Sequence, residues 1–76
     1  MNKQRRASIS KALGYLDMAL DMIRDAKYEE QDVLDNVPEN LQSGDRYEEI
    51  ENAVDSLEDA ISSMEEAKRY IERAIS

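Results

Sequence analysis

The chain contains no cysteine, histidine, tryptophan or phenylalanine, and its 76 residues include one proline and two glycines. Without cysteine, neither disulfide bonds nor thiolate zinc sites can add to the small core that so short a chain can build. Without histidine, the usual base of an activated nucleophile and the Glu-x-x-His metal motif are both excluded. A glycine-rich phosphate loop and the spacing of an EF-hand are also absent. We therefore expect no enzymatic activity, no cofactor and no metal site.

The sequence also lacks any uninterrupted run of 18 apolar residues, so we expect no segment to cross a membrane. Lys3, Arg5 and Arg6 give the N-terminus a positive charge, but the continuous apolar stretch of a signal peptide does not follow them. The lack of cysteine agrees with a reducing compartment. We expect a cytoplasmic protein.

What the chain does contain is one pattern that occurs twice, at an offset of 41 residues. In each half a large apolar residue (position a) is followed three residues later by alanine (position d) and four residues later by a second large apolar residue (position e). The alanines are Ala12, Ala19 and Ala26 in the first half, and Ala53, Ala60, Ala67 and Ala74 in the second. The large residues are Ile9, Leu13, Leu16, Leu20, Ile23, Ile50, Val54, Leu57, Ile61, Met64, Ile71 and Ile75. Because seven residues span two helical turns, each half predicts a helix with one apolar stripe, and central alanines would let another helix approach closely.

The two predicted helices span about residues 4–34 and 45–75, and residues 35–44 connect them within a single domain, 1–76. Pro38 lacks an N–H group and disfavours helix at the residue before it, so the first helix must end earlier. Similar lengths and a short connection favour an antiparallel hairpin. The fold class is therefore all-α. Between residues 28 and 32 the apolar stripe is interrupted by polar residues, which indicates a more hydrated loop end or, as an alternative, a partner-facing notch.

Local signals within the connection predict its details. Pro38–Leu41 can form one short helical turn, with Asn36 as its N-cap. Ser43 and Asp45 compete to cap the second helix, and Asp45 has the spacing of a capping box with the glutamate three residues later. We expect Val37 and Leu41 to pack onto the end of the helix pair.

The apolar stripes are wider than two helices can bury between them. Leaving half of the large side chains in water would forfeit about 1–2 kcal/mol for each. A second hairpin over the open face would recover this loss, so we expect a dimer or larger assembly, and a four-helix bundle in particular. Tyr15, Met18 and Met22 form a further apolar row on the first helix, and they are candidates for a second oligomer contact or a docking surface for another protein.

The net charge of −8 is unevenly distributed, because residues 1–27 carry +3 and residues 28–76 carry −11. A hairpin would gather basic residues at its open end and acidic residues at its loop end, which permits three interpretations. The two ends align an antiparallel dimer, the basic end binds the phosphate of a nucleotide or nucleic acid, or the acidic flank mimics nucleic acid and occupies a basic groove of another protein. The candidate anion-binding residues are Arg5, Arg6, Lys11, Arg69 and Arg73. The candidate residues of the acidic flank are Glu48, Glu49, Asp55 and Asp59.

The turn Asn36-Val37-Pro38-Glu39-Asn40-Leu41-Gln42-Ser43, followed by Arg46 and an acidic helix, resembles a group of small acidic helical-hairpin proteins of bacteriophages and prophages. The resemblance covers about residues 28–76; Gly44 departs from the pattern, and the first helix matches only in periodicity. It implies an accessory protein of a mobile element, acting in the host cytoplasm. Such proteins are often interaction modules, and some block host defence by binding a host protein or sequestering a nucleotide signal.

We therefore expect a non-enzymatic, oligomeric helical protein that acts by stoichiometric binding of a host protein, with acidic mimicry of nucleic acid as one mechanism of an anti-defence inhibitor. A nucleotide-sequestering protein that uses the basic end and a purely structural oligomerisation module are the alternatives.

Overall fold

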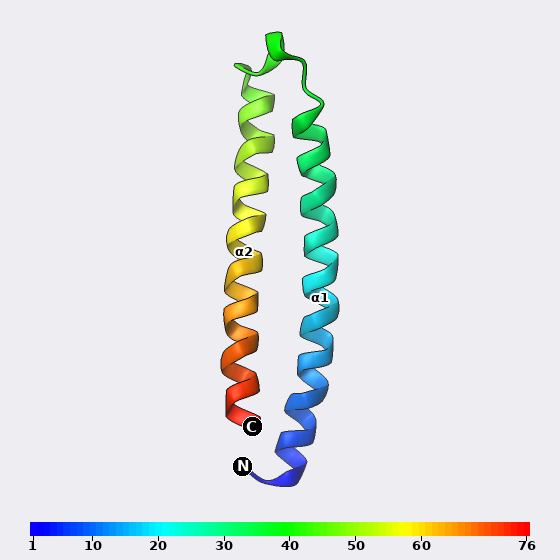
Figure 1. The fold of residues 1–76 in the computed structure, drawn as a ribbon, viewed down its shortest axis with the longest axis vertical. Coiled ribbons are helices and arrows are strands. Elements are labelled where there is room, and N and C mark those ends of the chain that lie inside the picture. Colours follow the sequence, from blue (N-terminus) through cyan, green and yellow to red (C-terminus); the bar gives the residue numbers. More distant parts are fainter.

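The computed structural model describes residues 1–76 as two long antiparallel helices joined by a short turn (Figure 1). Helix α1 spans Lys3–Asp35, the 3-10 turn η1 spans Glu39–Leu41, and helix α2 spans Asp45–Ile75. Both chain termini lie at the end opposite the loop, and the Cα trace measures 59 × 15 × 14 Å. The predicted helical hairpin is confirmed. Neither helix holds a stretch long and apolar enough to span a membrane.

The end of α1 is closed by Asn36, whose side-chain Nδ2 donates a hydrogen bond of 2.7 Å to the carbonyl oxygen of Asp32. Asn36 is thus the C-cap of α1, and the prediction that it caps the short turn is wrong. Pro38 takes the capping position of η1 instead, without a side-chain hydrogen bond. At the other end of α1, Asn2 Oδ1 accepts the Arg5 N–H at 2.8 Å, which satisfies one of the free donors of the first turn.

Helix α2 begins after Gly44, so the prediction that Ser43 or Asp45 caps it is also wrong. The Gly44 N–H donates a hydrogen bond of 3.3 Å to the Leu41 carbonyl oxygen. The turn therefore closes at Gly44, one residue after Ser43. The Gly44 carbonyl oxygen then accepts the first helical bond of α2. Of the two residues expected to pack onto the helix ends, Val37 is half-buried, whereas Leu41 is 57% exposed.

The interface between the helices is formed by the large residues at positions a and e. In α1 the buried or half-buried members of this set lie four and three residues apart in alternation, and α2 repeats the same spacing at the offset of 41. Leu20, Ile50 and Val54 are the only fully buried residues of the chain. All other members of the predicted apolar core are half-buried: Ile9, Leu13, Leu16, Ile23, Leu57, Ile61, Met64, Ile71 and Ile75.

The prediction that the alanines lie at the centre of this interface is wrong. Ala19 and Ala53 are half-buried, but the other five are exposed: Ala12, Ala26, Ala60, Ala67 and Ala74. At about 100° per residue, positions a and e point within about 40° of each other, while position d lies about 60° beyond a. Turning both large positions toward the second helix buries more apolar area than centring the alanines. The alanines are therefore left along one side.

The predicted polar interruption brings polar groups to the interface near the loop. The Lys27 side chain is 21% exposed, and Glu30 and Gln31 are half-buried. Gln31 Nε2 donates to the Asp35 carboxylate at 2.9 Å, and no buried side-chain nitrogen or oxygen lacks a partner. The Gln31–Asp35 bond lies within α1, and the Lys27–Glu58 ion pair, at 3.3 Å, joins the two helices in this half of the hairpin.

Candidate interaction surfaces

Three ion pairs cross between α1 and α2, and they are arranged with an internal symmetry. They are Asp17–Lys68 at 2.8 Å, Arg24–Glu65 at 3.0 Å and Lys27–Glu58 at 3.3 Å. The offset of 41 residues converts Asp17–Lys68 into Glu58–Lys27, and it exchanges the two members of Arg24–Glu65. The hairpin therefore has an approximate two-fold axis that passes near the Arg24–Glu65 pair.

These ion pairs raise the pKa of two basic groups. The hydrogen bond from Arg24 to Glu65 raises the pKa of the guanidinium, and the hydrogen bond from Lys68 to Asp17 raises the pKa of the ammonium group. Both groups are partly exposed, so the pairs add modestly to stability and mainly fix how the helices lie against each other.

The charges of the ion pairs and the alanines lie on opposite sides of the interface. Asp17 and Arg24 each follow a position-a residue by one place, as Glu58 and Glu65 do in α2, whereas the alanines follow by three. Relative to position a, a residue one place later is rotated about +100° around the helix, and a residue three places later about −60°. The ion-pair residues and the alanines therefore lie on opposite sides of the interface. A two-fold axis between antiparallel helices keeps equivalent residues on one side of the pair. The hairpin thus has an ion-pair face and an alanine face, the latter holding both alanine columns.

Large apolar side chains also border the alanine face. Tyr15, Met22 and Tyr70 precede a position-a residue by one place, which puts them beside the alanine columns, and Val33 occupies an alanine position. Their exposed fractions are 58%, 71%, 56% and 45%, respectively. Met18, which is 55% exposed, points away from α2. The predicted row of Tyr15, Met18 and Met22 is therefore divided, with two members at the alanine face and one on the outer side of α1.

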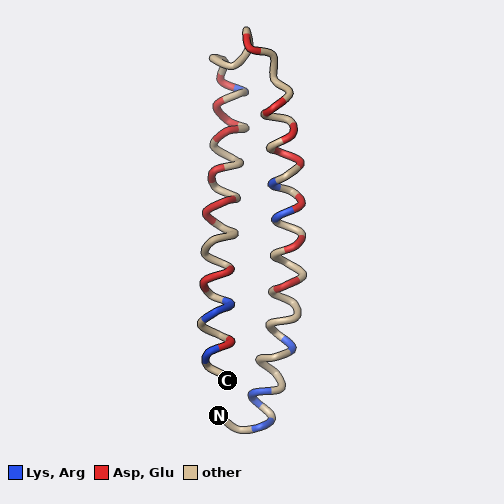
Figure 2. Tube along the Cα trace, viewed as in Figure 1, with Lys and Arg blue, Asp and Glu red and all other residues tan.

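The basic residues gather at the open end of the hairpin (Figure 2). Arg69 and Arg73 line a shallow hollow of about 410 Å³ together with Glu72 and Ser76. The Arg73 guanidinium also lies 5.2 Å from the centre of the Tyr70 ring. The candidate residues of α1, namely Arg5, Arg6 and Lys11, are exposed and do not line this hollow. The predicted anion-binding group is thus only partly assembled, and the Glu72 carboxylate opposes an anion there.

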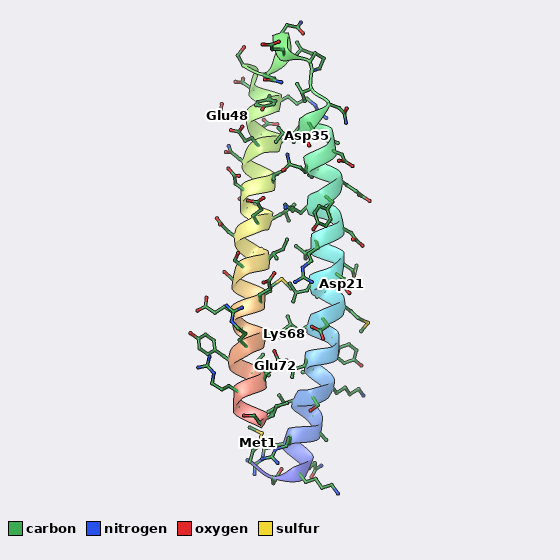
Figure 3. The ribbon with its side chains drawn as sticks, in the orientation of Figure 1. Met1, Asp21, Asp35, Glu48, Lys68 and Glu72 are labelled. Carbon is green, nitrogen blue, oxygen red and sulfur yellow. The ribbon has the colours of Figure 1, made fainter.

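The four candidate residues of the acidic flank are exposed, and none of them makes an ion pair within the chain: Glu48, Glu49, Asp55 and Asp59. Figure 3 shows Glu48 near the loop end of α2, with Lys68 and Glu72 on the half nearer the termini. The α2 carboxylates that do pair with α1, those of Glu58 and Glu65, lie on the ion-pair face. The flank therefore keeps its negative charge available to a partner.

A further hollow of about 460 Å³ lies at the loop end, where no hollow was predicted from the sequence. Its apolar lining consists of Val33, Val37, Pro38, Leu41 and Ile50, with Tyr47 beside them. Tyr47 lies three residues before Ile50 and so occupies position e of the repeated pattern. Tyr47 could therefore have been assigned to the interface from the sequence. The hollow can hold an apolar side chain or a small apolar molecule.

One pH dependence follows from the Asp17–Lys68 pair. Because the folded-state pKa of Lys68 is raised, the pair stabilises the hairpin fully below about pH 10.4, the usual lysine pKa, and this contribution is lost as the pH rises through the raised value. Between pH 9 and pH 11.5 the melting temperature of the protein should fall more than that of Lys68→Arg, whose guanidinium stays charged. Circular dichroism measures the melting temperature of each protein, and the two sequences are otherwise identical. Equal falls would show that the pair does not stabilise the fold.

No group of three or more acidic, histidine or cysteine side chains is placed to hold a metal ion. In comparisons with known proteins, the chain matches no family model, no curated protein and no solved structure.

Proposed function

We propose that the protein is a non-enzymatic binding protein whose working form is an assembly of hairpins, in the simplest case a four-helix bundle. The observation that supports this most strongly is the incomplete core, since only three of the 76 side chains are buried. A chain of this length has little core to spare, and nine large interface residues that are only half-buried can gain burial from a second hairpin. Two hairpins would supply the four helices that normally enclose such stripes.

We propose further that the acidic flank on α2 is the surface that binds a partner protein. Glu48, Asp55 and Asp59 lie on the outer side of α2, away from both α1 and the alanine face, and so remain exposed in a bundle. A row of unpaired carboxylates favours a partner with a basic groove, because complementary charge accelerates and orients association. A host nucleic-acid-binding protein has such a groove. The resemblance of the turn to small acidic hairpin proteins of phages supports a role as an inhibitor of host defence in the cytoplasm.

The test is capture from a bacterial lysate on the immobilised full chain, with both proteins and small molecules identified. We expect a nucleic-acid-binding protein to be retained and to be released by added duplex DNA. Neutralising the flank with Glu48→Gln, Glu49→Gln, Asp55→Asn and Asp59→Asn should abolish the retention. The matched control removes four exposed charges from α1 instead, with Asp21→Asn, Asp25→Asn, Glu29→Gln and Asp32→Asn, and should retain the partner. Undiminished capture by the flank variant would contradict the proposal.

A second candidate function, sequestration of a nucleotide signal, is favoured by the hollow that Arg69 and Arg73 share at the open end. If this function holds, the same capture should retain a nucleotide and no protein. Arg69→Glu combined with Arg73→Glu should then release the nucleotide, because the two guanidinium groups would supply its phosphate contacts. An assembly that captures neither class would be a structural oligomerisation module.

A further inference from the structure

We infer that the alanine face is the self-association surface and that a second copy of this chain packs on it with its loop at the opposite end. This inference rests on the proposed assembly and specifies the face, the orientation and the register.

The two faces of the hairpin differ in what they leave without a partner. On the ion-pair face, Lys27, Lys68 and Arg24 already bind carboxylates across the interface, so a second hairpin there would have to cover charged groups. On the alanine face, side chains are small along both helices, and the large apolar side chains of Tyr15, Met22 and Tyr70 at its edges are each more than half exposed. The acidic residues at these edges, Glu29 and Glu49, lie toward the loop end. Covering the alanine face therefore removes the most apolar surface from water and buries the fewest charged groups.

The shape of this face suits another hairpin. Alanine at the contact permits helix axes to approach to about 8 Å, the short end of the usual range. At that distance the half-buried residues at positions a and e, which lie between the two alanine columns, become enclosed. The Cα envelope of the hairpin is 59 Å long and 15 Å wide, an area on the order of the ~800 Å² that each partner contributes to a stable dimer.

Charge sets the orientation. The half of the hairpin near the termini, residues 1–16 and 67–76, carries seven basic side chains and one acidic side chain, whereas residues 28–52 around the loop carry nine acidic and one basic. Figure 2 shows this division along both helices. Two hairpins with their loops at the same end would place like charges together. With the loops at opposite ends, each basic end lies over an acidic loop region.

The two-fold symmetry of the hairpin sets the register. In the opposite-end arrangement α1 packs on α1 of the second copy, and α2 packs on its α2. The level of the Arg24–Glu65 pair marks the middle of the hairpin, and Ala19 and Ala26 lie on either side of it, as Ala60 and Ala67 do in α2. Ala19 therefore meets Ala26 of the second copy, and Ala60 meets Ala67 of the second copy, without any shift along the axis.

The orientation is tested with single cysteines, because the chain has none of its own. Met22 lies near the middle of α1 at the edge of the alanine face, so in the opposite-end dimer it lies close to Met22 of the second copy. Met22→Cys should form a disulfide-linked dimer in most of the protein under mild oxidation at micromolar concentration. The control Met18→Cys lies on the outer side of α1 and should remain monomeric on a non-reducing gel. Equal cross-linking of the two variants, or of neither, would overturn the orientation.

The face is tested by one added charge. Ala60→Glu buries a carboxylate in the proposed contact and should raise the dissociation constant roughly 100-fold, because an unpaired buried charge costs several kcal/mol. Ser62→Glu adds the same charge to the outer side of α2 and should leave the dissociation constant within about threefold. Circular dichroism checks that both variants keep their helices. If the unmodified chain is monomeric, the proposed assembly fails; if it associates and Ala60→Glu associates equally well, the assembly stands and the alanine face is excluded.

Discussion

Replacing Leu20 with alanine should lower the free energy of unfolding by about 2–5 kcal/mol. Leu20 is 1% exposed, the lowest exposed fraction among the three buried residues, and the other two, Ile50 and Val54, lie nearer the loop in α2. Removing its side chain would leave a cavity in the best-packed part of the interhelical interface, and so small a core has few neighbours that can fill it. Urea denaturation followed by circular dichroism, at one fixed protein concentration, measures the change.

The control for this prediction is Met18→Ala, because Met18 lies on the outer side of α1 and is 55% exposed. Its effect should stay within about 0.5 kcal/mol. The loss of unfolding free energy for Leu16→Ala and for Leu57→Ala should lie between those for Leu20→Ala and Met18→Ala, since Leu16 and Leu57 are half-buried in the hairpin. If Leu20→Ala cost no more than Met18→Ala, the helices could not be packed through positions a and e.

Reversing two charges at the open end, Arg5→Glu with Arg6→Glu, should weaken self-association and strengthen α1 at the same time. In the opposite-end dimer these residues lie over the acidic loop of the second copy, so the dissociation constant should rise about tenfold in low salt, as two attractive contacts become repulsive. Helix α1 has no acidic residue in its first turn, and glutamates there would interact favourably with the helix dipole.

Salt and ligand binding separate the interpretations of this result. Because exposed charges are screened over about 8 Å at physiological ionic strength, raised salt should weaken association of the unmodified chain and shrink its difference from the variant. Analytical ultracentrifugation across a salt series measures both effects. An unchanged dissociation constant with loss of nucleotide binding would instead assign the basic end to phosphate. An unchanged constant without nucleotide binding in either protein would exclude both roles.

The features of the fold that could be predicted from sequence are those set by nearby residues. Pro38 ends the first helical pattern, and the repeat at an offset of 41 residues marks two helices of similar length, so the bounds of α1 and α2 differ from the prediction by at most about one residue. The caps could not be predicted in the same way. Whether Ser43 or Gly44 precedes α2 depends on the bond between Gly44 N–H and the Leu41 carbonyl oxygen, which forms only when the whole turn closes.

The alanine face could not be predicted because the repeat contains more apolar positions than one neighbouring helix can cover. The pattern shows that positions a, d and e share a side of the helix, but it does not show which two of them face the helix of the same chain. The ion pairs did leave a signal in the sequence, because Asp17 and Lys27 recur as Glu58 and Lys68 at the offset of 41 residues. Antiparallel packing then brings each acid to the lysine of the other helix.

The arrangement assigns self-association and partner binding to different surfaces, which could not be distinguished from the sequence. In the proposed assembly the alanine face forms the contact, whereas the carboxylates of Glu48, Asp55 and Asp59 lie outside it and keep their charge. Glu49 precedes Ile50 by one place and so borders the alanine face. We therefore expect Ala60→Glu to weaken mainly self-association, and the neutralised flank to weaken mainly capture of a partner. Loss of both properties in the flank variant would show that the two surfaces overlap.

The central claim, that the hairpin completes its core with a second copy, is tested most directly by sedimentation equilibrium of the unmodified chain at micromolar concentration. We expect a mass of twice the 8.7 kDa of the chain, or a higher multiple, that falls toward 8.7 kDa on dilution. A species of 8.7 kDa at every concentration, with the helix content of the folded hairpin, would contradict it.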